Sequence, residues 1–169
     1  VLATGVSGIP SVPEIAGLKS FAGKVMHSSA YDDGENWKGK RAIVVGTGNS
    51  GHDIAQDLHS SGADVTMFQR SSTLVVSIEP SAQLVYAPYN EGTLEDNDLI
   101  ATSMPLQLAR KSHRLTGEKS KALDQELLDG LARAGFKLDY GEDNTGWQFK
   151  YLTRGGGYYF NVGASELIA

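Results

Sequence analysis

The sequence predicts an α/β fold, namely a Rossmann-like, doubly wound parallel sheet with a helical insertion. A short apolar run from Arg41 to Val45 leads into glycines at G-x-G-x-x-G spacing, which are followed by a helical pattern from His52 to His59. A second strand pattern follows from Asp64 to Gln69. This order of strand, turn, helix and strand is the context in which such glycines bind a dinucleotide, whereas the glycine spacing alone is a weak signal.

Composition and charge narrow the class of protein. The chain has 169 residues, of which 40% are hydrophobic and 8% aromatic, as expected for one globular domain. A net charge of -5 argues against a nucleic-acid surface, and no apolar run is long enough to span a membrane. Without cysteine, the chain can form no disulfide, thiolate nucleophile or cysteine-based metal site. A reducing compartment fits this composition, and we expect a cytoplasmic protein.

The first residues have the character of a connection between domains. Val1 to Gly5 is an apolar run with strand character, and Pro10 and Pro13 then favour an extended crossing segment. We interpret residues 4 to 19 as an interdomain linker. The chain begins without Met and carries no stop signal at residues 166 to 169, so we interpret it as a fragment of a longer protein.

Each glycine of the loop has a separate expected role. The strand from Arg41 to Val45 is expected to be buried on both faces. Gly46 would allow a tight turn out of it, Gly48 would let a pyrophosphate approach the main chain, and Gly51 would let helix and strand pack closely. The N–H groups at the start of the helix would then face the phosphates.

Three polar residues complete this loop. The side chains of Asn49 and Ser50 can cap the helix or contact the cofactor, and the sequence leaves both alternatives open. We include Thr47, Asn49 and Ser50 with the three glycines among the predicted cofactor-binding residues.

The end of the second strand indicates which nucleotide binds. An NAD site usually has Asp or Glu there to bind the ribose 2′-hydroxyl, but this chain has no carboxylate at that place. Arg70 offers a planar set of donors suited to a 2′-phosphate, and Ser71 or Ser72 could add a hydroxyl. These residues predict NADP(H), with Gln69 as a weaker candidate contact. The alternative is that Arg70 is a solvated cation at a strand end.

Further strand signals frame the predicted insertion. Residues 73 to 79 predict a third strand that Pro80 ends, and residues 136 to 140 predict another short one. Gly155 to Gly157 form a loop that could admit a ligand or merely turn the chain, and the turn is favoured; a last strand is predicted after it at residues 158 to 163.

Two helices are predicted between these strands. One runs from Leu106 to Leu115 with Pro105 at its first position, and the other from Ser120 to Arg133 with Gly135 as its stop. Residues 81 to 104 show no clear period. The basic residues of the first helix could bind phosphate, although a solvated face is favoured; they are Arg110, Lys111, His113 and Arg114. A solvated turn is also favoured over a metal or acid/base site for Asp139, Glu142 and Asp143.

The segment before the first strand carries a family resemblance. Phe21, Gly23, His27 and Tyr31 have the spacing F-x-G-x-x-x-H-x-x-x-Y, and a Rossmann glycine loop follows them. This pattern resembles the fingerprint of the flavin-containing monooxygenases. Ala3 to Gly5 resembles the linker motif of those enzymes, and Gly46 to Gly51 resembles their NADPH-binding loop. Related Baeyer-Villiger enzymes usually have Trp or Pro at the position of Tyr31, so the branches that oxygenate N or S, or that oxidise pyruvates, are favoured.

The resemblance implies a division of the chain and a function. Residues 1–38 would form the linker and fingerprint segment, and residues 39–169 the NADP(H)-binding domain, with a helical insertion at about 80–145. The last strand, with Tyr159, Asn161 and Gly163, would rejoin the parallel sheet near the cofactor. NADPH would deliver hydride to FAD for O₂ activation and for oxygenation of a soft nucleophile in a small-molecule substrate. The partner would be the FAD-binding domain of the same full-length protein, because FAD would be bound mainly by regions outside this chain.

The resemblance also assigns roles to single residues and leaves alternatives. His27 would hold the domain junction and the nicotinamide geometry, and Tyr31 would pack against that junction. No residue of the chain would need to act as acid, base or nucleophile, and the isolated fragment would be inactive. The alternatives are a domain of another two-dinucleotide flavoprotein, such as a disulfide-reductase relative, or a Rossmann module that serves only for interactions.

Overall fold

The computed structural model describes Val1 and residues 8–169. Apart from Val1, the strand expected over Val1 to Gly5 lies outside the described residues, as does the Ala3 to Gly5 motif. Described residues before position 41 contain three short 3-10 helices, at Leu18–Ser20, Ser28–Ala30 and Glu35–Trp37.

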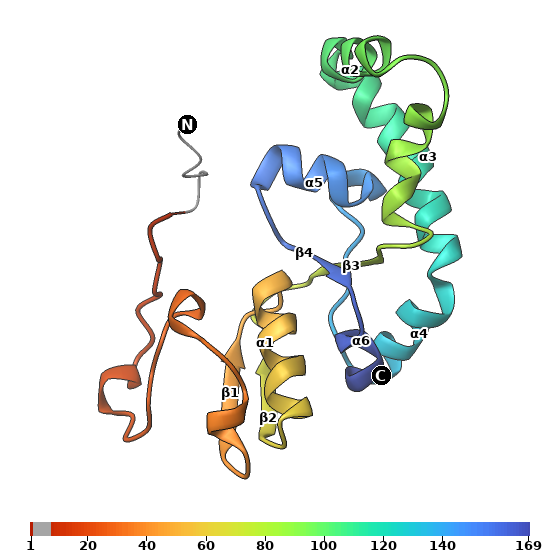
Figure 1. The fold of residues 1–169 in the computed structure, drawn as a ribbon. Helices are drawn as coiled ribbons and strands as arrows, with labels where there is room; N and C mark the ends of the chain where they lie inside the picture. Colours follow the sequence, from red (N-terminus) through yellow and green to blue (C-terminus); the bar gives the residue numbers. More distant parts are fainter. Residues whose placement is uncertain (2–7) are drawn as a thin grey trace.

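The predicted strand-turn-helix-strand unit is present, and we call it the Rossmann unit. It consists of β1 (Arg41–Val45), α1 (Asn49–Ser60) and β2 (Asp64–Phe68) (Figure 1). The two strands are parallel and in register from Arg41 opposite Asp64 to Val45 opposite Phe68. The helix packs on one face of the strands through a buried cluster of Val44, Leu58 and Ala63.

The opposite face of this strand pair is open. Ile43, Val45 and Phe68 remain 66%, 54% and 57% exposed. The expectation that the first strand is buried on both faces is therefore wrong, because the described residues place a helix over one face only. Side chains alternate between the faces of a strand, so every second apolar residue of β1 is left uncovered.

A second parallel pair forms the other sheet. It joins β3 (Leu74–Ser77) to β4 (Tyr158–Asn161), with Leu74 opposite Tyr158 and Ser77 opposite Asn161. The α/β class and the return of the last strand to a parallel partner are confirmed, but the strands form two two-stranded sheets, β1-β2 and β3-β4, in place of one. Only residues 69–73 connect β2 to β3, whereas parallel neighbours in one sheet need a crossover of about a dozen residues.

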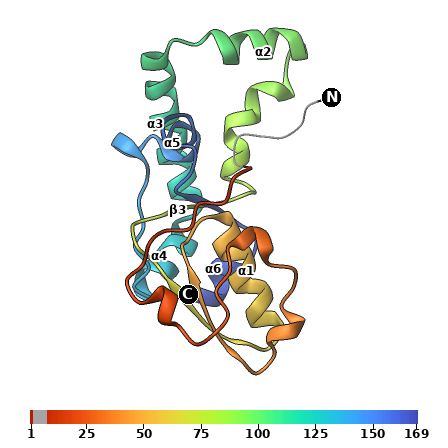
Figure 2. The same cartoon turned by 90° about the vertical axis from the view of Figure 1, so that its left-hand side faces the viewer.

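Helices fill the chain between β3 and β4, as predicted for an insertion. They are η4 (Ala82–Asn90), α2 (Leu94–Ser103), α3 (Leu106–Leu123), α4 (Gln125–Arg133), η5 (Glu142–Asn144) and α5 (Gly146–Arg154), and α6 (Ala164–Ile168) follows β4. Figures 1 and 2 show α2 at the end of the molecule farthest from the Rossmann unit. None of the described helices is both long and apolar enough to cross a membrane.

Several of these elements differ from the sequence prediction. The first predicted insertion helix does not end at Leu115 but continues through Gly117 to Leu123. A glycine is required within the helix because a Cβ at Gly117 would lie 2.6 Å from the carbonyl oxygen of Asn144. The break comes instead at Asp124, whose buried carboxylate accepts hydrogen bonds from the main-chain N and the Oγ of Ser77.

One helix was not predicted, and one predicted strand is not formed. No residue of α2 is buried, so this helix has no apolar periodicity that the sequence could reveal. The short strand predicted over residues 136–140 is reduced to a single bridge between Leu138 and Thr73. Gly135 does end α4 as predicted, with a positive φ of 83°.

The two sheets have separate cores. Beside β3 and β4, a fully buried Tyr159 packs with Val75, Leu128, Leu131 and Ala164. This core joins the insertion helix α4 and the terminal helix α6 to the second sheet. The Rossmann unit contacts it mainly through α1, which lies against β4 and α6.

Candidate functional site

The glycine loop, residues 46–51, has the geometry that its spacing predicts. Gly46 has a φ of 112°, and its N–H donates to the carbonyl of Phe68 over 3.0 Å. A Cβ at Gly51 would lie 2.4 Å from the carbonyl oxygen of Gly46, so only glycine permits this close packing. A Cβ at Gly48 would meet nothing within 4 Å. The loop is therefore tight on the side of the strand and open at Gly48.

The loop and Arg70 lie at the same edge of the strand pair. Val45 and Phe68, the last residues of β1 and β2, are directly opposite each other, and Arg70 follows Phe68 by two positions. Arg70 and Ser71 are exposed. No hydrogen bond or ion pair joins the Arg70 side chain to another residue in the described part of the chain. The carboxyl ends of parallel strands thus bring together the two halves of the predicted nucleotide site.

Two polar side chains of the loop are engaged inside the protein. The buried Thr47 Oγ1 lies 2.5 Å from Thr73 Oγ1, and the Asn49 Oδ1 accepts from the main-chain N of Phe160 over 2.9 Å. Gly48 is the N-cap of α1, and no side-chain hydrogen bond caps the helix start, so the capping alternative for Asn49 and Ser50 is not observed. Ser50 is exposed. A contact of Thr47 with a nucleotide would thus come from its main chain, and a contact of Asn49 from its main chain or its Nδ2.

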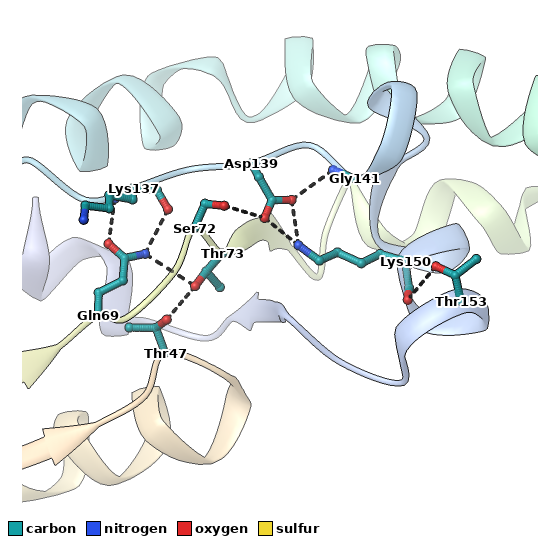
Figure 3. A network of polar contacts seen from close by, with 9 residues as sticks. All are labelled: Thr47, Gln69, Ser72, Thr73, Lys137, Asp139, Gly141, Lys150 and Thr153. Atoms are coloured by element: carbon teal, nitrogen blue, oxygen red, sulfur yellow. Dashed lines mark hydrogen bonds and ion pairs between the residues drawn. The ribbon is translucent and has the colours of Figure 1, made fainter. Parts of the chain in front are cut away.

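The residues around Arg70 divide into engaged and exposed ones. The Gln69 amide bonds both main-chain groups of Lys137: Nε2 donates to its oxygen over 2.8 Å, and Oε1 accepts from its nitrogen over 2.7 Å (Figure 3). The Ser72 Oγ donates to the Asp139 carboxylate over 3.1 Å. Gln69 is thus unsuited to direct nucleotide contact, and Ser71 is a better second donor than Ser72.

His52 is a site neighbour that the sequence analysis missed. It lies in the first turns of α1, is fully buried, and its Nδ1 is 3.1 Å from the Gly48 carbonyl oxygen. Its ring stacks on that of Tyr159 at 3.7 Å, with planes 3° apart. Burial lowers the pKa of His52, although the Gly48 carbonyl acts in the opposite direction. No sequence pattern marks this role, because Tyr159 comes from the far end of the chain.

The fingerprint segment packs on the Rossmann unit. The Tyr31 hydroxyl donates to the Asp57 carboxylate of α1 over 2.7 Å, and its ring packs beside the cluster of Val44 and Leu58. Burial, together with the hydrogen bond to Asp57, raises the pKa of Tyr31. The Nδ1 of His27 accepts from Ser29 N over 3.1 Å in a local turn. The packing of Tyr31 agrees with its predicted structural role, whereas the cofactor role of His27 stays a prediction.

The charged residues of the insertion pair with each other. Arg110 bonds Glu142 over 2.9 Å and also bonds Asp143, and the Nε of Arg114 donates to the Asp143 carbonyl over 3.1 Å. The basic face of α3 and the acidic turn were each predicted to be solvated. Both predictions are incomplete, because η5 lies against α3 and the two sets of charges form ion pairs with each other. The described residues contain no group of three His, Asp or Glu side chains arranged for a metal ion.

Comparison with known proteins fits this geometry. Residues 1–119 match the family described as pyridine nucleotide-disulphide oxidoreductase, which is more than half of the chain. The chain belongs to this family. The match includes the whole Rossmann unit and Arg70, the parts on which the prediction of a nucleotide site depends.

Individual relatives of this pyridine nucleotide-disulphide oxidoreductase domain are flavin monooxygenases of plants. The probable indole-3-pyruvate monooxygenase YUCCA10 of Arabidopsis thaliana is 43% identical over 79 residues, which are 47% of this chain and 21% of that protein. Indole-3-pyruvate monooxygenase YUCCA1 of Oryza sativa subsp. japonica is 43% identical over 79 residues, 47% of this chain and 20% of that protein. The chain spans about a fifth of the length of these relatives.

A longer match extends into the insertion. The probable indole-3-pyruvate monooxygenase YUCCA3 of Arabidopsis thaliana is 35% identical over 112 residues, which are 66% of this chain and 24% of that protein. The resemblance to flavin-containing monooxygenases is confirmed as partial homology. The chain is a pyridine-nucleotide-binding domain related to these oxidoreductases.

Proposed function

We propose that this chain is the NADP(H)-binding part of an FAD-dependent monooxygenase. The observation that carries the proposal is the shared edge of β1 and β2, where the open glycine loop and the exposed Arg70 lie together. The open main chain at Gly48 suits a diphosphate, and Arg70 with Ser71 suits a 2′-phosphate. The family match and the plant monooxygenase relatives support the same proposal.

The residues of this chain would bind and orient the nucleotide. NADPH, when bound, would supply a hydride for the reduction of FAD, which we propose to be held mainly by other parts of a longer protein. The glycine loop would hold the diphosphate at the start of α1, while Arg70 would fix the adenosine end. His27 would help to hold the domain junction. None of these side chains would act as an acid or base.

The proposed substrate is a small molecule with a soft nucleophilic N or S atom, or a related compound such as a 2-oxo acid. The relatives named above are indole-3-pyruvate monooxygenases, and the presence of Tyr31 instead of Trp or Pro favours the same side of the wider family. We propose that the partner is the FAD-binding domain of the same protein and that the enzyme acts in the cytoplasm. The substrate pocket would lie largely outside this chain.

The proposal is tested by calorimetric titration of the 169-residue chain with NADPH and, separately, with NADH at one salt concentration. We expect NADPH to bind more tightly than NADH. Arg70→Ala should reduce the free energy of NADPH binding by about 1.5 to 3 kcal/mol, because a charge-assisted hydrogen bond to the 2′-phosphate is lost. Arg133→Ala, a loss of charge at the end of α4, is the matched control. Equal binding of NADPH by the wild type and Arg70→Ala would contradict the assignment of Arg70.

A further inference from the structure

The connection between β2 and β3, residues 69–73, carries more than Arg70. Its side chains reach both the glycine loop and the segment at residues 137–139. We propose that Gln69 is a positioning residue that sets the preference for NADP(H) by holding Arg70 in place relative to the glycine loop. This inference rests on the proposed function and deepens it.

The Gln69 amide forms a two-point clamp on Lys137. Its oxygen and its nitrogen bond the main-chain N and O of that residue, at 2.7 and 2.8 Å. Lys137 is itself fixed, because its carbonyl also accepts from the main-chain N of Thr73 over 2.9 Å. Because both the oxygen and the nitrogen of the Gln69 amide are hydrogen-bonded, a change of its rotamer would break both bonds. Since Arg70 directly follows Gln69, the clamp fixes the point from which the guanidinium extends.

A buried hydrogen bond links this clamp to the glycine loop. The Thr73 Oγ1 lies 2.5 Å from the Thr47 Oγ1, and the Gln69 Nε2 donates to the same Thr73 oxygen over 3.4 Å. Thr47 and Thr73 are 8% and 3% exposed. Hydrogen bonds in such low-dielectric surroundings are strong and hold their geometry. Figure 3 shows the resulting chain of contacts from Thr47 through Thr73 and Gln69 to Lys137.

This network matters for one nucleotide more than for the other. Recognition of a 2′-phosphate by a planar guanidinium depends on direction and distance, and binding groups must be held to about 0.5 Å. NADH has no 2′-phosphate, so its binding would depend on the glycine loop and not on Arg70. A less fixed position of Arg70 should therefore weaken the binding of NADPH alone. General damage to the fold should weaken the binding of both NADPH and NADH.

The test replaces Gln69 by methionine in the 169-residue chain. Gln69→Met keeps the length of the side chain but removes its hydrogen bonds. We expect NADPH to bind about tenfold more weakly, which corresponds to the loss of one to two hydrogen bonds. The affinity for NADH should change by less than about twofold. Calorimetry measures both affinities. The matched control is Gln125→Met, because among the described residues the Gln125 amide bonds only the nearby Asp129 on α4. In an Arg70→Ala background, Gln69→Met should cause no further loss of NADPH affinity.

A second pair of variants tests the same network at another point. Thr73→Val removes the hydroxyl that joins Gln69 to Thr47, and Thr73→Ser keeps it. We expect the valine variant to lose NADPH preference and the serine variant to retain it, which would support the proposal even if Gln69→Met did not fold. The proposal would be overturned if Thr73→Val lost affinity equally for NADPH and NADH. It would also be overturned if neither Gln69→Met nor Thr73→Val lost affinity for NADPH. A wild-type chain without preference for NADPH would instead contradict the proposed function itself.

Discussion

At the scale of single residues, the three loop glycines are not equivalent. Gly51 is held against the main chain of Gly46, and Gly46 itself needs a positive φ, whereas Gly48 has an ordinary φ of -84° and open space around it. The first two residues are therefore constrained by the fold. Gly48 is needed only where a ligand approaches the main chain. Within this one loop, Gly46 and Gly51 therefore contribute to stability, whereas Gly48 contributes to nucleotide binding.

Substitution by alanine should reveal this difference. We expect Gly51→Ala to lower the free energy of unfolding by about 2 to 4 kcal/mol, because the new Cβ would lie 2.4 Å from the Gly46 oxygen and the backbone would have to move. Gly48→Ala should cost about 1 kcal/mol or less, the effect of a poorer N-cap, while it weakens NADPH binding. Urea unfolding and calorimetry measure the two effects. Similar stability of both variants would contradict the packing role of Gly51.

His52 should make the stability of the chain depend on pH. Burial lowers its pKa in the folded state, whereas the unfolded chain binds a proton near pH 6.5. Below that pH the unfolded state binds more protons, so the free energy of unfolding should fall as the pH drops, by at most about 1.4 kcal/mol per pH unit. His113, whose pKa is also lowered by burial, adds an effect of the same sign.

The contribution of His52 can be isolated by substitution. We expect His52→Phe, which keeps an aromatic ring against Tyr159, to flatten the decrease between pH 7 and pH 5 in urea unfolding experiments. The control His113→Gln should leave the larger part of the decrease in place, since His113 is only partly buried. An unchanged pH dependence in His52→Phe would contradict a lowered pKa of this histidine in the folded state.

At the scale of elements, the sequence predicted those whose patterns are local. β1, α1 and β2 follow from a strand pattern, three glycines and helical spacing, and the structure confirms all three, although α1 begins at Asn49 and not at His52. The extent of α3 was wrong because its packing against η5, not its own sequence, keeps Gly117 helical. Likewise, α5 forms where aromatic and polar residues alternate, because Phe149 and Lys150 are buried by tertiary contacts.

The ion pair between Lys150 of α5 and Asp139 should matter more than the surface pairs. The Lys150 side chain is 9% exposed, and its Nζ lies 2.5 Å from Asp139 Oδ2. Burial raises the pKa of Asp139, but the Lys150 ammonium and the Gly141 amide outweigh it and hold the pKa below its usual value. This contribution is present at neutral pH and is lost as the pH falls through that lowered pKa.

Removal of one partner should therefore destabilise the second sheet. We expect Asp139→Asn to lower the free energy of unfolding by about 2 to 3 kcal/mol at pH 7, because the Lys150 charge would remain buried without a counter-ion. Arg110→Gln, which breaks pairs that are about half exposed, should cost under about 1 kcal/mol. Urea unfolding of both variants checks the contrast, and equal costs would contradict the importance of burial.

At the scale of the whole molecule, the chain consists of two parallel strand pairs with separate cores. The Rossmann unit meets the second sheet through α1 and through the contacts of Thr47, Asn49 and Gln69. These side chains were singled out from the sequence as candidates for nucleotide contact. In the structure they join the site to the rest of the fold, and they leave Arg70 and the loop main chain exposed.

The sequence by itself determined the family, the α/β class, the glycine loop and the position of Arg70. These follow from short-range patterns, because spacing along one strand, turn or helix fixes local backbone geometry. Only the tertiary structure decided the division into two sheets, the burial of His52 against Tyr159, and the use of Gln69 as a clamp on Lys137. Each of these depends on contacts between residues far apart in the chain, and no spacing within a single element records which distant segment a side chain will meet.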